Sequence, residues 1–163
     1  NPDANPAIET VHVLDEPLCL ISAAAKARGP ARKPAPLALA ELAALPLVLP
    51  EPSHAIRKLL ETQAALAGLK LNIACEVSSV SAILELVRSG HGHAVLAPSA
   101  IAASGQAAAF AMRPLAEAVL SSTLCLAVSA HKPATPLLRQ ATRLLSELVQ
   151  ASVARPAVHN RMR

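Results

Sequence analysis

Residues 46–98 read PLVLPEPSHAIRKLLETQAALAGLKLNIACEVSSVSAILELVRSGHGHAVLAP, and this stretch decides the fold. Short apolar runs at 47–49, 71–77 and 94–97 alternate with segments in which apolar residues recur at helical spacing. Such alternation is typical of β-α-β units, whose strands are parallel and whose crossovers are right-handed. The stretch therefore predicts a βαβαβ core in an α/β fold.

Helix boundary signals divide this stretch further. Pro52 and Ser53 open the first helix, which runs from Ser53 to Ala67 and stops at Gly68. The second helix is capped by Ser78 or Ser79, and it ends at Gly90. Residues 71–77 alternate apolar with polar side chains, which predicts a strand at a sheet edge.

Outside the core the pattern predicts fewer elements. Residues 9–14 and 17–22 read as two strands joined at Asp15-Glu16, and 39–44 as a short helix after a loop over 25–36. Residues 116–129 read as one long strand. Thr135 and Pro136 open a final helix, with an apolar stripe at Leu137, Leu138, Ala141, Leu144, Leu145 and Leu148. The residues from 151 to 163 carry no such pattern.

Composition excludes several classes of protein. With 53% hydrophobic and 16% charged residues over 163 positions, the chain is expected to be globular. No apolar run of about eighteen residues is uninterrupted, so no transmembrane helix is expected. Cys19, Cys75 and Cys125 lie far apart in apolar runs. That spacing favours buried structural thiols over a metal site, in a reducing, cytoplasmic setting.

The net charge of +4 raises the question of nucleic-acid binding. The basic residues cluster in 26–33 and in 155–163, and both segments read as solvated surface or linker. Phe110 is the one aromatic residue, so the chain lacks the stacking platform that binds bases. We expect no direct contact between this chain and nucleic acid.

Serine residues follow two of the strands predicted to be parallel. Ser53 begins one helix and Ser78/Ser79 the other, so hydroxyls and unpaired backbone N–H groups are expected at one sheet edge. Open α/β sheets bind ligands at that edge, which here favours a small anion. Serine is also a common helix cap in proteins that bind nothing there. His54 has two readings as well, an exposed polar residue or a pocket donor.

Patterns that signal catalysis or metal binding are weak. The turn Gly90-His91-Gly92-His93 lacks further spaced ligands, so glycine backbone geometry explains it better than a metal site does. The sequence has no GxSxG elbow, Walker loop, GxGxxG or HExxH motif. Glu51, Ser53 and His54 are sequence neighbours, and such neighbours rarely form a triad. We expect no enzyme activity, no metal and no cofactor.

The order of segments resembles the effector-binding domain of LysR-type transcriptional regulators. The resemblance rests on residues 15–21 (DEPLCLI), 39–50 (LAELAALPLVLP), 52–57 (PSHAIR) and 76–99 (EVSSVSAILELVRSGHGHAVLAPS). It implies a fold like that of type-2 periplasmic binding proteins, with two Rossmann-like subdomains, the first incomplete. Residues 1–45 then belong to the first subdomain, 46–118 to the second, 119–150 to the first again and 151–163 to a tail.

The resemblance also implies a function. A small, anionic effector is expected between the two lobes, and the family's DNA-reading helix-turn-helix is expected outside this sequence. Arg57 is expected to be a structural anchor, and Glu85 and Arg88 to be solvated. The expected effector-binding residues are Glu51, Pro52, Ser53, His54, Ser78, Ser79 and Val80.

Partners follow from the same resemblance. It implies a homodimer or homotetramer that reaches promoter DNA and RNA polymerase through the full-length protein, with no membrane contact. Helix 53–67 and strand 71–77 resemble the side-by-side dimer surface. The alternative is a periplasmic solute-binding protein of a transport system, which shares the expected fold.

Overall fold

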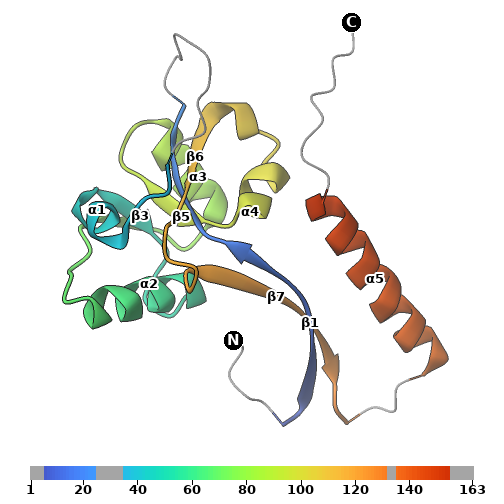
Figure 1. The fold of residues 1–163 in the computed structure, drawn as a ribbon. Coiled ribbons are helices and arrows are strands. Elements are labelled where there is room, and N and C mark those ends of the chain that lie inside the picture. The colour runs from blue at the N-terminus through green and yellow to red at the C-terminus, as the bar shows by residue number, and fades with distance from the viewer. Residues whose placement is uncertain (1–5, 25–34, 132–134, 155–163) are drawn as a thin grey trace, which may run out of the picture. The chain divides into compact units, whose positions relative to one another are not determined.

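The βαβαβ core appears in the computed structural model, which describes residues 6–24, 35–131 and 135–154 (Figure 1). β3 (Leu47–Leu49), α2 (Ala55–Leu66), β4 (Ile73–Glu76), α3 (Val80–Arg88) and β5 (Ala94–Leu96) follow in the predicted order. The basic clusters and most of the tail named above lie outside the described residues.

The chain divides into two units, which are described separately. The first unit comprises residues 1–16 and 123–163, and the second comprises Pro17–Ser122. In the first unit, strands β1 (Ile8–Pro17) and β7 (Ser121–Ser129), whose last and first residues cross the boundary, pair as a two-stranded sheet. Helix α5 (Pro136–Ala154) completes it.

The second unit is built around β3 and β5, which are buried on both faces. β2 (Cys19–Ala23) pairs antiparallel with β5 and with β6 (Phe110–Pro114), while β3 pairs parallel with β4. A parallel bridge between Leu47 and His93 connects β3 to the start of β5. β4 is at an edge and alternates half-buried with exposed residues, so the predicted edge strand is confirmed.

Side-chain alternation along the strands separates two hydrophobic clusters. Leu18, Leu20, Leu47, Leu49 and Val95 pack with α1 (Leu39–Ala44) and α2. The intervening residues point to the other face and pack with α3 and α4 (Pro98–Ala103). Each face of the sheet is therefore covered by two helices, which explains why the strand runs are continuously apolar.

The second unit begins earlier than the boundary expected at residue 46. β2 lies between β5 and β6, and Leu39, Leu42 and Ala43 of α1 belong to the same core cluster as β3. Residues 17–45 therefore pack with the unit that contains 46–118. The unit extends to Ser122 because the Leu18 N–H donates to the Leu120 carbonyl at 2.9 Å.

Two strand predictions differ from the structure, and three short elements were not predicted. β1 continues through Asp15-Glu16 to Pro17, so no break falls there. The strand expected over 116–129 begins only at Ser121, because a turn bonds the Leu120 N–H to the Glu117 carbonyl at 3.0 Å. α4, the short 3-10 helix η1 (Ala107–Ala109) and β6 have no counterpart in the prediction.

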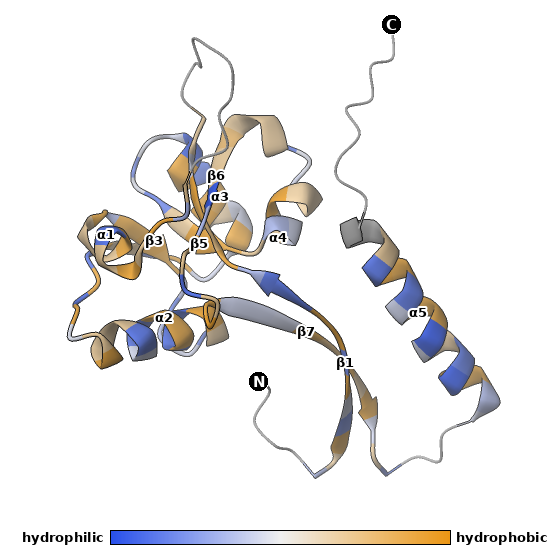
Figure 2. Ribbon diagram, viewed as in Figure 1, coloured by the Kyte–Doolittle hydropathy of each residue, from blue (hydrophilic) through white to orange (hydrophobic). Residues whose placement is uncertain are grey.

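The final helix begins as predicted. The Thr135 Oγ1 accepts a hydrogen bond from the Leu138 N–H at 3.2 Å, and Gln150 Nε2 donates to the Val13 carbonyl at 3.0 Å. Figure 2 shows hydrophobic and hydrophilic residues alternating along α5. Leu137, Leu144, Leu145 and Leu148 of the expected stripe remain exposed.

The glycine turn before β5 has the predicted backbone geometry. Gly90 has φ +83° and Gly92 has φ +151°, both in the region that side chains rarely adopt. His93 then donates its N–H to the Pro46 carbonyl at 2.9 Å, and its carbonyl accepts from the Val48 N–H at 2.7 Å. The turn thereby aligns β5 with β3.

Two composition-based expectations can be compared with the described residues. Cys19 is buried as expected, whereas Cys75 and Cys125 are only half-buried, so the prediction of three buried thiols is wrong for these two. Within 6–24, 35–131 and 135–154, no helix combines the length and the apolar character needed to cross a membrane.

Candidate functional site

The carboxyl ends of β3 and β4 meet at one edge of the second unit. Leu49 pairs with Glu76 in the parallel register, and the Val77 N–H donates to the Leu49 carbonyl at 3.0 Å. The residues that follow the two strands therefore start beside each other. They are all exposed, and they are the residues predicted for the site, Glu51, Pro52, Ser53, His54, Ser78, Ser79 and Val80.

His54, rather than Ser53, occupies the N-cap of α2. Its Nδ1 accepts a hydrogen bond from the Ile56 N–H at 3.3 Å, and the helix begins at Ala55, two residues after the Ser53 that was expected to begin it. An acceptor Nδ1 assigns the proton of the neutral ring to Nε2. His54 thus caps the helix with one nitrogen and offers the other as a donor.

Ser79 occupies the N-cap of α3, but its hydroxyl does not cap the helix. Its Oγ lies 2.8 Å from the Ser81 Oγ, and no side chain accepts from the first turn at this cap. Ser78 precedes the cap. The first-turn N–H groups of α3 therefore point out of the helix beside two serine hydroxyls, an arrangement that suits an anionic or strongly polar ligand.

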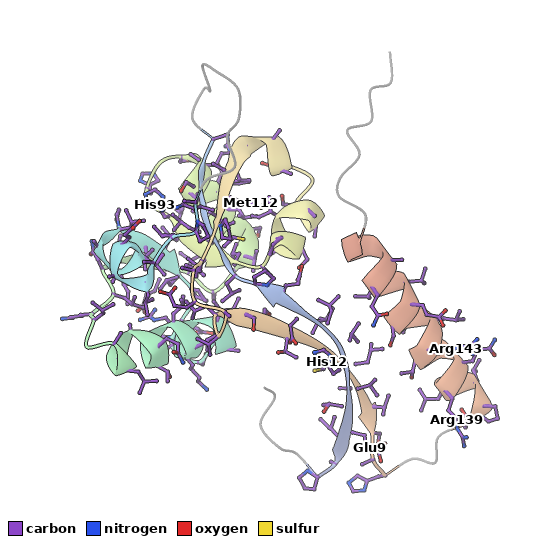
Figure 3. The ribbon with its side chains drawn as sticks, in the orientation of Figure 1. Glu9, His12, His93, Met112, Arg139 and Arg143 are labelled. Carbon is purple, nitrogen blue, oxygen red and sulfur yellow. The ribbon has the colours of Figure 1, made fainter. Side chains whose placement is uncertain are left out.

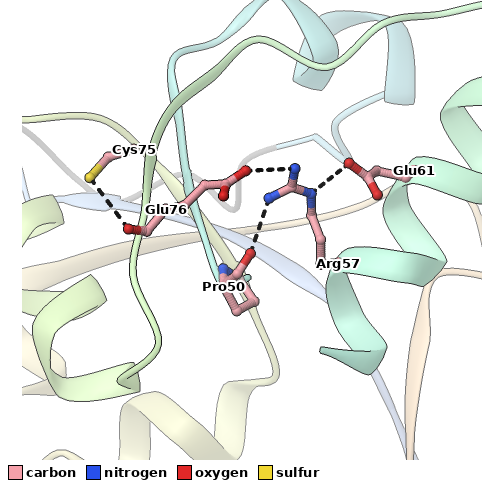
Figure 4. A network of polar contacts seen from close by, with 5 residues as sticks. All are labelled: Pro50, Arg57, Glu61, Cys75 and Glu76. Carbon is pink, nitrogen blue, oxygen red and sulfur yellow. Dashed lines mark hydrogen bonds and ion pairs between the residues drawn. The ribbon is translucent and has the colours of Figure 1, made fainter. Parts of the chain in front are cut away.

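Arg57 connects the segment that follows β3 with the end of β4. Its side chain is buried, and its guanidinium bonds the Pro50 carbonyl, Glu61 and Glu76 (Figure 4). The prediction of a structural anchor is confirmed. Burial opposes the charged form, but the hydrogen bonds that the guanidinium donates to the Glu61 and Glu76 carboxylates outweigh it and raise the pKa of Arg57.

The positive charge of Arg57 is therefore not available to an anion at this edge. Arg57 is paired with two carboxylates, and Glu51 adds an exposed carboxylate of its own. Glu85 and Arg88 form an exposed ion pair on α3, as predicted for solvated residues. An anion at this edge would be held chiefly by hydroxyl, imidazole and backbone N–H groups.

Two other polar features of the second unit have no local signal in the sequence. The Ser22 Oγ lies 2.7 Å from the His93 Nδ1, a contact between residues far apart in the chain (His93 is labelled in Figure 3). A cavity of about 100 Å³ adjoins α3. It is lined by Ser81, Leu84, Glu85, Ser104, Gln106 and Phe110. Only the packing of α3 against α4, η1 and β6 creates it.

Metal binding gains no support from the described part of the chain. No three histidine, cysteine, aspartate or glutamate side chains gather there in a way that could hold an ion. The His91-x-His93 pair contributes one ring to the Ser22 contact, and His91 is exposed.

The family model for the LysR substrate binding domain matches residues 1–150. A search of curated protein sequences finds no match.

Solved structures share the fold at low sequence identity. The regulatory domain of CcmR from Synechocystis, in complex with 2-PG, is 16% identical, with TM-score 0.73 over 91% of this chain and 70% of that one. An OxyR mutant from Corynebacterium glutamicum is 19% identical, with TM-score 0.73 over 94% and 47%. The BenM effector binding domain with its effector benzoate is 19% identical, with TM-score 0.70 over 98% and 71%.

Proposed function

Because the chain belongs to the LysR substrate-binding domain family, we propose that it senses a small anionic effector at the carboxyl edge of β3 and β4. The family match favours a regulator's ligand-sensing domain over the alternative of a periplasmic solute-binding protein. The observation that carries the proposal is the parallel pairing of Leu49 with Glu76, which brings two exposed, donor-rich segments to one edge.

Each predicted residue has a role in this proposal. Ser53 and the His54 Nε2–H donate to the effector from the α2 side. Ser78, Ser79 and the first-turn N–H groups of α3 donate from the other side, and Val80 and Pro52 supply apolar contact. Glu51 would repel a carboxylate, so we propose that it accepts from a hydroxyl of the effector. These residues form one side of the binding site.

We further propose that the ligand acts as a switch and not as a substrate. An effector that binds one arrangement of the protein more tightly shifts the population toward it. In the whole protein, a cytoplasmic homodimer or homotetramer, this shift would alter contacts with promoter DNA and RNA polymerase. The exposed surface of α2 and β4 is proposed as the side-by-side dimer contact.

Titration calorimetry on the full-length protein tests the site. The titrants are benzoate, the effector of BenM, and shikimate, which binds the effector binding domain of QuiR, another solved structure with this fold, together with other small carboxylates. For a carboxylate that binds, Ser53→Ala and Ser79→Ala together should weaken binding by about 2–4 kcal/mol, since each removes a hydrogen bond to a charged group. Ser89→Ala, at the opposite end of α3, is the matched control. Unchanged affinity in the double variant would refute the site.

A further inference from the structure

We propose that Arg57 is a positioning residue for the effector site, which it serves by tying the ends of β3 and β4 to the first turn of α2. This inference rests on the proposed function of that edge. Arg57 does not itself reach the effector in this proposal. It acts through the backbone segments that carry the donors.

The three contacts of the guanidinium each involve a different element. Nη1 donates to the Pro50 carbonyl at 3.0 Å, and Pro50 directly precedes Glu51. Nη2 donates to Glu76 Oε1 at 3.0 Å, and Glu76 is the last residue of β4. Nε donates to Glu61 Oε1 at 2.7 Å, one turn further along α2. Both halves of the candidate site are thus anchored to one side chain.

Burial makes this anchor more rigid than a surface ion pair. The Arg57 side chain is 4% exposed, whereas Glu61 and Glu76 are 44% and 49% exposed. The partners alone are therefore solvated, and the arginine fixes them from inside. A planar guanidinium holds its donors in a set fork, which lysine's single ammonium cannot reproduce.

The hydrogen bond from Arg57 to the Pro50 carbonyl holds the start of the loop that carries Ser53 and His54. Pro50 is buried, and the loop from Glu51 to His54 that follows it is exposed. Losing Arg57 would leave this buried carbonyl without the bond that fixes the start of the loop. The predicted consequence is local: the loop and the turn before α3 become mobile while the central strands stay protected.

Hydrogen–deuterium exchange of the full-length protein tests this directly. In Arg57→Lys, exchange should rise about tenfold in peptides covering residues 50–56 and 76–81, with β2 and β5 unchanged. Arg88→Met is the matched control, because Arg88 also pairs with a glutamate but only on the surface of α3. Unchanged exchange at both edge segments in Arg57→Lys would overturn the proposal. A uniform rise through the whole unit would overturn it too, because it would indicate a general stabilising role.

Variants of Glu76 separate the effect of its hydrogen bond with Arg57 from the effect of its negative charge. Glu76→Gln keeps an acceptor oxygen and should retain protection of residues 76–81, whereas Glu76→Ala should lose it. Equal exchange in these two variants would argue against the Glu76 contact as the tie.

Binding measurements then connect the anchor to the effector. For benzoate or shikimate, whichever the wild-type protein binds, Arg57→Lys should weaken affinity about tenfold while Arg88→Met leaves it unchanged. If the exchange result holds and affinity does not change, Arg57 orders an edge that the effector does not use, and the positioning claim fails. If the wild-type protein binds no carboxylate, the proposed function fails, and the exchange result alone decides whether Arg57 orders the edge.

Discussion

Replacing Gly92 by alanine is expected to destabilise the second unit by about 3 kcal/mol, since backbone strain and a backbone clash act together. A Cβ at this position would lie 2.7 Å from the Pro46 carbonyl oxygen and 3.1 Å from Val48 Cγ2. The same Pro46 carbonyl accepts a hydrogen bond from the His93 N–H, which connects the start of β3 to the start of β5. The substitution would therefore push β3 and β5 apart.

Gly90→Ala is the matched control for this effect. Gly90 also has positive φ, but a Cβ there meets nothing within 4 Å. Gly90→Ala should lower the free energy of unfolding by only about 1 kcal/mol, the cost of the backbone strain. Chemical denaturation followed by circular dichroism compares the two variants. Equal losses would show that the approach of Pro46 does not constrain the turn.

Replacing Leu60 by alanine is expected to cost about 3 kcal/mol, because it opens a cavity in the core beneath α2. Leu60 is fully buried and packs in the cluster that includes Leu47 and Leu49 of β3. The loss would loosen α2, whose N-cap His54 belongs to the proposed site, so weaker effector binding should accompany the lower stability.

Leu137→Ala makes the same chemical change on α5 without the cavity. Leu137 is 77% exposed and lies outside the proposed dimer contact, so this variant should unfold within about 0.5 kcal/mol of the wild-type protein. The same denaturation experiment measures both variants. A Leu60→Ala variant as stable as Leu137→Ala would contradict the packing described for α2.

The central elements could be predicted from the sequence because their signals are local. β3 and β5 are short and buried on both faces. Two residues after the last residue of α2 and of α3 comes a glycine with positive φ, Gly68 and Gly90 respectively. By contrast, α4, η1 and β6 lie in an alanine-rich stretch without hydrophobic periodicity. β6 is a strand because it pairs with β2, and a pairing over that separation in the chain leaves no local pattern.

The candidate site was predictable in its location but not in its hydrogen bonds. Ser53 is the better N-cap by residue preference, yet the imidazole of His54 accepts the Ile56 N–H. The helical spacing of Arg57 and Glu61 makes their pairing readable from sequence. Its contact with Glu76 depends on the parallel pairing of β3 and β4, and only the structure shows it.

The bonds around Leu18 have a consequence for how this protein could be rebuilt. The Leu18 N–H donates to Leu120 and its carbonyl accepts from the Leu115 N–H, so the entry and exit of Pro17–Ser122 lie side by side. A segment whose two ends are adjacent can be exchanged as a cassette with little demand on its host. Grafting residues 17–122 between related regulators would transplant the proposed recognition edge, which is one side of the proposed effector site, in one step.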